Sequence, residues 1–118
     1  MKIDSYTQGD ICVITFIGKL DYSSSEALSE KLMEIINKSK NIVIDMTKCT
    51  YVSSSGLRLL LVSGKRVKQL GNLIVLANLS EEVRDIMEMT GFGTIFKCCD
   101  TLYDALGYLD NNTTLERL

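Results

Sequence analysis

The segment that decides the fold is residues 41–77, NIVIDMTKCTYVSSSGLRLLLVSGKRVKQLGNLIVLA. It begins with a short apolar run, Ile42-Val43-Ile44, and ends with a second at residues 73–77. Short continuous apolar runs are typical of parallel strands buried on both faces. The residues between them predict a largely buried helix over about residues 54–70, closed by Gly71-Asn72. This order of elements indicates a parallel βαβ unit with a right-handed crossover.

The residues before this unit predict a hairpin followed by a helix. β-branched and aromatic residues fill positions 11–17, and the turn residues Gln8-Gly9-Asp10 place a partner strand at residues 2–7. The next helix has three candidate N-cap residues, Ser23, Ser24 and Ser25. Its apolar residues recur at helical spacing and should form one buried face: Leu28, Leu32, Ile35 and Ile36.

Two more helices and a short strand are expected after the unit. Ser80 can cap a third helix that ends at Gly91, residues 94–98 predict a last edge strand, and Thr101 can cap a final helix. The sequence therefore predicts an α/β fold with a mixed sheet of four to five strands and about four helices. Its sheet would combine the antiparallel hairpin with the parallel unit. We expect one domain over residues 1–110 and a polar, frayed tail over residues 111–118.

Composition restricts the function. The chain has 118 residues, a formal net charge of −2 and a pI near 5.1, which argues against nucleic-acid binding. No apolar run approaches the ~18 residues that a membrane-spanning helix needs, and the amino-terminal residues do not resemble a signal peptide. We therefore expect a cytoplasmic protein that does not contact a membrane.

Catalysis and metal binding are disfavoured by the same inventory. The chain has no histidine, so the usual general base for a serine or cysteine nucleophile is missing. The four cysteines, Cys12, Cys49, Cys98 and Cys99, contain no C-x-x-C pair for a zinc site. We expect reduced thiols, no cofactor and no enzymatic activity.

The residues with the most functional content are Ser53, Ser54, Ser55 and Gly56, at the start of the helix in the parallel unit. Serine hydroxyls can accept hydrogen bonds from amides that are free at a helix start. A phosphate added there would meet these amides and the positive end of the helix dipole. The cluster therefore indicates either a plain N-cap or a switch controlled by phosphorylation.

Several segments together resemble the STAS domain, and most closely the stand-alone bacterial anti-sigma factor antagonists. The resemblance covers residues 1–110 and rests on the order and spacing of five pieces. These are Gly18-Lys19-Leu20-Asp21, residues 42–47, residues 51–57, residues 70–73 and Met89-Thr90-Gly91-Phe92. Each piece alone is a weak signal.

The resemblance implies a regulator that switches partners. In that family the unphosphorylated antagonist binds an anti-sigma factor, which is also a serine kinase, and a sigma factor is released. The kinase then phosphorylates a serine at this helix start, and a serine phosphatase reverses the modification. Alignment on Gly56-Leu57 places the phosphoacceptor at Ser54, with Ser53 and Ser55 as alternatives. The family has aspartate where this chain has Ser53.

On the same basis we expect six residues to contribute to partner binding: Asp21, Tyr51, Ser53, Ser55, Gly56 and Arg58. Each has a structural alternative. Asp21 could be a turn or cap aspartate, and Tyr51 with Val52 could be buried loop anchors. Arg58 lies four residues after Ser54 and could pair with a phosphate or be a solvated arginine. Asp45 is expected to form an Asx-type hydrogen bond that stabilises its loop.

Two other functions remain open. The domain could be a phosphorylation-independent scaffold or accessory subunit of a signalling or lipid transport complex, which Ser53 in place of aspartate favours. It could also bind a small ligand or nucleotide, although it lacks a phosphate-binding loop. The antagonist hypothesis predicts a monomer when the chain is free.

Overall fold

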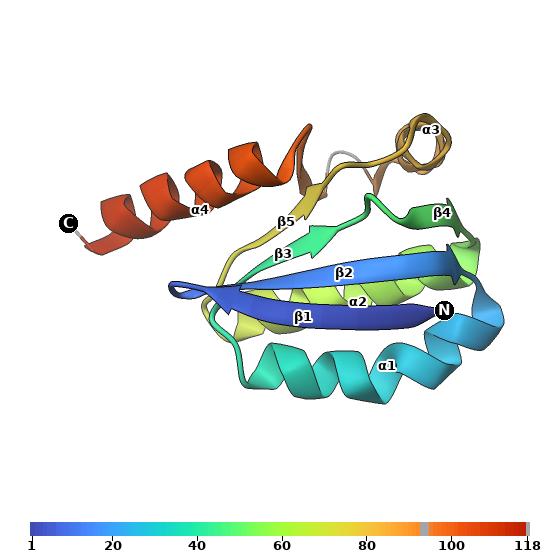
Figure 1. The fold of residues 1–118 in the computed structure, drawn as a ribbon, viewed down its shortest axis with the longest axis horizontal. Helices are drawn as coiled ribbons and strands as arrows, with labels where there is room; N and C mark the ends of the chain where they lie inside the picture. Colours follow the sequence, from blue (N-terminus) through green and yellow to red (C-terminus); the bar gives the residue numbers. More distant parts are fainter. Residues whose placement is uncertain (93–94, 118) are drawn as a thin grey trace.

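The computed structural model describes residues 1–92 and 95–117, with side chains described up to residue 112. In chain order the elements are β1 (Lys2–Gln8), β2 (Ile11–Leu20), α1 (Tyr22–Asn37), β3 (Asn41–Asp45), β4 (Cys49–Val52), α2 (Ser54–Gln69), β5 (Ile74–Ala77), α3 (Glu81–Thr90), β6 (Lys97–Cys99) and α4 (Leu102–Arg117). The expected hairpin and the parallel βαβ unit are confirmed (Figure 1).

The sheet is mixed, as expected. Its main path runs β1-β2-β3-β5-β6, with β1 antiparallel to β2 and the other neighbours parallel. Besides these five strands, the described residues form one more, β4, which pairs with β2 off the main path and was not predicted. The long strand β2 pairs with β3 through residues 11–15 and then with β4 through residues 18–20, with a register shift between Gly18 and Lys19. Residues 49–52, just before the serine cluster, are therefore a strand, whereas Tyr51 and Val52 were expected in a loop.

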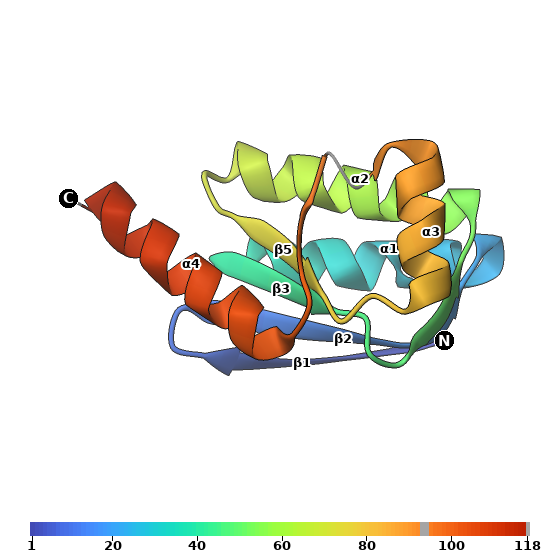
Figure 2. The same cartoon turned by 90° about the horizontal axis from the view of Figure 1, so that it is seen from above.

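Side chains alternate along each strand, so the central strands present apolar residues on both faces of the sheet. Helices cover both of these faces. On β3, Ile42 and Ile44 join the larger core cluster, which also contains residues of α1, α2 and α3. Val43 faces the opposite side and packs with Ala105 and Leu109 of α4. Figures 1 and 2 show α1 and α2 together on one side of the sheet and α4 on the other.

The N-cap of α1 differs from the prediction. Asp21, and none of the three serines, is the cap: its carboxylate accepts the N–H of Ser24 at 3.0 Å. The Ser24 hydroxyl in turn accepts the N–H of Asp21 at 2.9 Å, which completes a capping box. The structure therefore confirms the cap interpretation of Asp21 and leaves its partner contact untested.

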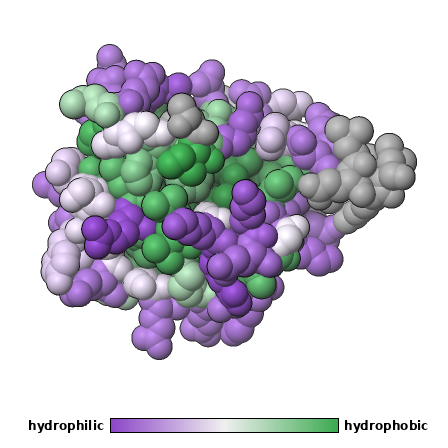
Figure 3. Space-filling model, turned by 180° about the vertical axis from the view of Figure 1, so that it is seen from behind, coloured by the Kyte–Doolittle hydropathy of each residue, from purple (hydrophilic) through white to green (hydrophobic). Residues whose placement is uncertain are grey.

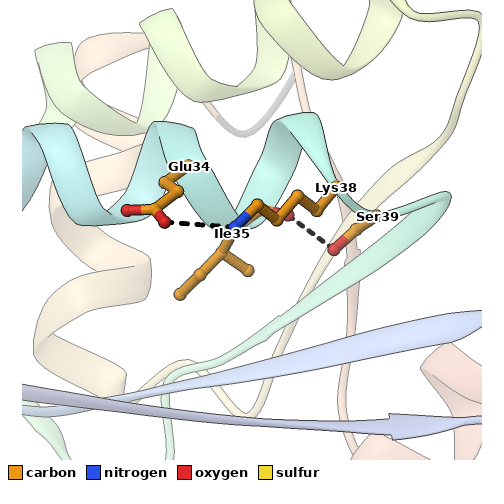
Figure 4. A network of polar contacts seen from close by, with 4 residues as sticks. All are labelled: Glu34, Ile35, Lys38 and Ser39. Carbon is orange, nitrogen blue, oxygen red and sulfur yellow. Dashed lines mark hydrogen bonds and ion pairs between the residues drawn. The ribbon is translucent and has the colours of Figure 1, made fainter.

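The carboxyl end of α1 is closed by side chains (Figure 4). The Ser39 hydroxyl donates to the Ile35 carbonyl at 2.6 Å, and Lys38 Nζ lies 3.2 Å from Glu34 Oε1. The serine satisfies one of the carbonyls that a helix end leaves free. The ion pair is exposed and contributes little, because solvent screens it.

The remaining helix ends follow the sequence closely. Ser80 caps α3 by accepting the Val83 N–H at 3.1 Å, and Gly91 ends this helix in the left-handed region at φ 77°. Strand β6 begins at Lys97, later than expected, and Thr94 lies outside the described residues. Helix α4 continues to Arg117 and so includes most of the segment expected to fray.

Candidate functional site

The serine cluster stands at the first turn of α2. Ser53 has extended backbone angles and is the N-cap; its hydroxyl accepts the Gly56 N–H at 3.2 Å. Its carbonyl accepts the Leu57 N–H at 2.9 Å. The amides of Ser54 and Ser55 precede the first intrahelical bonds, so they have no partner within the helix. The expected helix start is confirmed, and Ser53 is its capping residue.

This helix start is fastened to the end of β2. The Ser53 N–H donates to the Leu20 carbonyl at 2.9 Å. Gly56 lies so close to the same carbonyl that an added Cβ would be 2.5 Å from the Leu20 oxygen and 3.0 Å from Val52 Cγ1. A side chain at position 56 would therefore force the helix away from the strand. Glycine is required here so that α2 can approach β2 closely. The hydrogen bond from Ser53 to Leu20 holds the start of the helix in position against the strand.

Ser54 is the accessible hydroxyl of the three. Its residue is exposed, whereas Ser53 and Ser55 are half-buried. The Ser53 hydroxyl is already engaged as the cap. The first turn of α2 contains no acidic residue, in contrast to α3, which has Glu81 and Glu82. The positive end of the α2 dipole is therefore uncompensated, and an added anion at Ser54 would be stabilised there.

A shallow groove of about 250 Å³ lies between α1 and α2 beside this helix start. Ser55 and Arg58 both line it, together with Tyr22, Ser25, Glu26, Ser29, Leu59 and Val62. The structure thus brings two of the predicted residues into one groove. Arg58 is exposed and one helical turn from Ser54, as the spacing predicted.

Two apolar residues of this surface were missed by the sequence analysis. Tyr22 is 65% exposed at the start of α1, and Val62 is 48% exposed on α2. Val62 could have been found, because it follows Arg58 by four residues and so lies on the outward face of α2. Tyr22 could not, since its place opposite α2 depends on how the two helices pack. Such exposed apolar side chains near a polar rim are common at protein interfaces.

Tyr51 and Val52 were expected to be either exposed partner contacts or buried anchors, and the two residues differ in this respect. Tyr51 is 46% exposed on β4, and Val52 is 1% exposed and belongs to the core. The reason is the strand that the sequence analysis missed, because successive residues of a strand point to opposite faces. Tyr51 therefore remains available to a partner, whereas Val52 is a core residue.

The carboxylates near the site have structural partners. The backbone N–H and then the hydroxyl of Ser24 donate to Asp21, and these bonds lower the pKa of its carboxyl. Asp45 Oδ1 accepts the Thr47 N–H at 3.0 Å and the Asn78 side-chain amide at 3.1 Å. The expected Asx-type bond of Asp45 is confirmed.

Nothing in the described residues provides a reactive thiol or a metal site. The four cysteines are free, and burial raises the pKa of Cys49, Cys98 and Cys99. These thiols are poor nucleophiles near neutral pH, because the thiolate is the reactive form. Within residues 1–92 and 95–117, no group of three or more potential metal-ligating side chains comes together, and none of the helices could span a bilayer.

Comparison with known proteins identifies the family. The family model of the STAS domain matches residues 2–105. BtrV of Bordetella bronchiseptica, named for an anti-sigma factor antagonist role, is 32% identical over 80 residues, 67% of this chain and 69% of that protein. The anti-sigma-B factor antagonist of Bacillus subtilis is 29% identical over 82 residues, 70% of this chain and 75% of its own length.

The fold agrees with this assignment. The anti-sigma factor antagonist SpoIIAA, in its unphosphorylated form, superposes with a TM-score of 0.77 at 20% identity, covering 93% of this chain and 97% of that one. The phosphorylated form of Bacillus SpoIIAA gives a TM-score of 0.69, also at 20% identity, covering 91% of this chain and 98% of that one. At this identity the likeness speaks for the fold alone. Sequence match and fold agree, and the chain belongs to the STAS domain family.

Proposed function

We propose that this protein is an anti-sigma factor antagonist that is switched off by phosphorylation of Ser54. It binds an anti-sigma factor that is also a serine kinase, and a sigma factor is thereby released. A serine phosphatase restores the active form. The related proteins named as antagonists support this role. The protein acts in the cytoplasm and is a monomer when free.

The observation that carries the proposal is the exposure of Ser54 and its position at the start of α2. It is exposed at the first position of α2, next to a capping serine whose hydroxyl is occupied. A kinase can reach Ser54 without displacing the cap that holds the helix start. Arg58 lies one turn further along and can pair with the phosphate, although its exposure limits the strength of such a pair.

The same modification can preserve the fold and break the complex. A phosphoserine adds a charge of about −1.5 to −2 at neutral pH. In the free protein, the amides at the start of α2 and the helix dipole stabilise this charge. In a complex, the phosphate would lie in the interface formed by Tyr51, Arg58 and the groove between α1 and α2. A tenfold loss of affinity requires only about 1.4 kcal/mol, which the desolvation of a phosphate readily exceeds.

The proposal is tested in two steps. Intact-mass spectrometry with fragmentation, on protein isolated from its native cell, should find one phosphate at Ser54. Binding to the anti-sigma factor is then measured for Ser54→Ala, which should bind, and Ser54→Asp, which should bind at least tenfold more weakly. Asn111→Asp, an exposed position on α4, adds the same charge at a distant site and should bind normally.

One observation favours a second function, a scaffold that works without phosphorylation. The family has aspartate at the position of Ser53, so a kinase would meet a different recognition sequence here. A partner that co-purifies with the chain while no phosphate appears under any growth condition would establish the scaffold and reject the switch. A phosphate at Ser55 or Ser53 would retain the switch and reject Ser54 as its site.

A further inference from the structure

A second concave surface lies at the other end of α2, away from the serine cluster. It has a volume of about 400 Å³ and is formed by the second half of α2, the start of β5, residues 95–97 and Tyr108 of α4. We call it the lysine groove. Its lining residues are Leu61, Gly64, Lys65, Lys68, Asn72, Leu73, Ile74, Ile95, Phe96, Lys97 and Tyr108. Lys65 follows Ser54 by eleven residues of helix, roughly 16 Å along its axis.

The groove exists because the residues just before β6 do not pair with β5. Strand β6 pairs with β5 only from Val75 to Ala77. Before Lys97 the chain turns away, and the N–H groups of Ile95 and Phe96 donate to the Phe92 carbonyl, at 3.0 and 3.3 Å. A wedge therefore opens beside Ile74. Gly64 lets the Phe96 ring come close to α2, since an added Cβ would be 2.7 Å from it.

The wedge has an apolar interior. Leu61, Leu73 and Ile74 are half-buried around it, Phe96 is buried beneath it, and Ile95 is 58% exposed at its margin. Figure 3 shows hydrophobic surface gathered on the face opposite to that of Figure 1, bordered by hydrophilic side chains. An apolar hollow of this size favours an apolar occupant, because burial of apolar surface releases free energy in proportion to area.

The rim of the groove carries charge of one sign. Lys65, Lys68 and Lys97 line it, and none of its lining residues is acidic. The ion pairs in the described part of the chain use other lysines and an arginine, Lys2, Lys38, Lys40 and Arg84. Lys97 Nζ lies 5.0 Å from the centre of the Tyr108 ring, a cation–π contact that leaves the charge at the rim. In a protein of net charge −2, three lysines without acidic neighbours in the groove mark a site for an anion.

We propose that the lysine groove binds a small single-chain amphiphile with an anionic head, such as a fatty carboxylate. The chain would occupy the wedge over Phe96 and Ile74, and the head would lie among the three lysines. The size of the groove supports a small molecule: its volume falls within the range of about 300–1,000 Å³ that ligand pockets have. A protein partner would need some 20–30 residues on this side, and the groove offers eleven.

The test uses the full chain and decanoate, kept below the concentration at which it forms micelles. Isothermal titration should give saturable binding, and amide chemical shifts should move at Leu73, Ile74 and Lys97 and stay unchanged at Ser54. Lys65→Gln/Lys68→Gln should weaken binding by about twofold to thirtyfold, since each exposed charge pair contributes about 0.2–1 kcal/mol. Lys31→Gln/Lys48→Gln removes the same charge from exposed positions outside the groove and should bind like the native chain. Added salt should weaken binding.

Two further probes separate the head from the chain. Decanol and decyltrimethylammonium carry the same chain with a neutral and a cationic head, and both should bind several-fold more weakly than decanoate. Equal affinity for decanoate and decanol would overturn the role of the lysines. Absence of saturable decanoate binding, or shifts confined to other surfaces, would overturn the site. If the anti-sigma factor protects these amides from exchange and decanoate does not bind, the groove is a protein contact and the proposal fails.

Discussion

Replacement of Gly56 by alanine tests how closely α2 is fastened to β2. The added Cβ would stand 2.5 Å from the Leu20 oxygen and 2.8 Å from Leu20 Cγ, so helix and strand must separate. Overpacking of this kind costs about 1–3 kcal/mol. The moving carbonyl also weakens its bond from Ser53, worth about 1 kcal/mol. Alanine recovers about 1 kcal/mol of helix propensity. The sum predicts a destabilisation of about 1–3 kcal/mol.

The assay is urea unfolding, with a helical glycine in open space as the matched control. Gly107 lies in α4, and an added Cβ there would have no neighbour within 4 Å. Gly107→Ala should therefore stabilise the protein by about 0.5–1 kcal/mol, since only propensity changes. Gly64→Ala should fall between the two, because its obstacle is the Phe96 side chain and not backbone. If Gly56→Ala raises the urea midpoint as Gly107→Ala does, the close approach is refuted.

Three other perturbations have defined outcomes. Ser53→Ala should lower the free energy of unfolding by about 0.5–2 kcal/mol in urea, because the Gly56 N–H loses its cap, and Ser53→Asp should restore it. Gly71→Ala should destabilise by about 1–2 kcal/mol, because its φ of 77° is left-handed; an unchanged urea midpoint would contradict this. Acidification should weaken the start of α1: the hydrogen bonds from Ser24 lower the Asp21 pKa, so the stability that this carboxylate provides is complete above about pH 4. It is lost as the pH falls through the lowered pKa, and Asp21→Asn should flatten that acid dependence in urea unfolding at low pH.

The parts of the fold that could be predicted from sequence are those with local causes. The end of α2 is an example: Gly71 and Asn72 donate to the carbonyls of Lys68 and Val67, at 2.9 and 3.0 Å. This Schellman motif needs only a glycine after the last turn, which the sequence displays. The buried strands were equally visible, since an apolar run covered on both faces has no other stable environment.

The missed strand β4 has a non-local cause. Its two end residues, Cys49 and Val52, are buried and its two central residues are exposed, and four residues are too few to distinguish this pattern from a loop. It forms a strand because β2 is long: residues 18–20 of β2 extend beyond β3, and β4 provides their partner on that side. That requirement is visible only once the register of β2 and β3 is known.

The candidate site also contains some features with local causes and others that depend on tertiary packing. The start of α2 and the spacing of Ser54 and Arg58 follow from local chemistry. The choice of Asp21 over the neighbouring serines depended on a serine at the third helical position, where glutamate or glutamine is the usual capping-box residue. The exposed Tyr22 joins the site through helix packing, which no local pattern encodes.

The register shift at Gly18 lies beside the amino terminus, and this position decides where a protein or label can be attached. Gly18 is in the left-handed region at φ 112°, and a Cβ there would be 3.5 Å from Met1 Cα. The amino terminus therefore lies against the end of β2 that holds Ser53, whereas the carboxyl end of α4 projects from the opposite end of the molecule (Figure 1). A fluorophore or affinity handle joined at Met1 would crowd the surface proposed here for partner binding. Attached beyond α4, the same handle would leave that surface open, so immobilisation for binding measurements belongs at the carboxyl end.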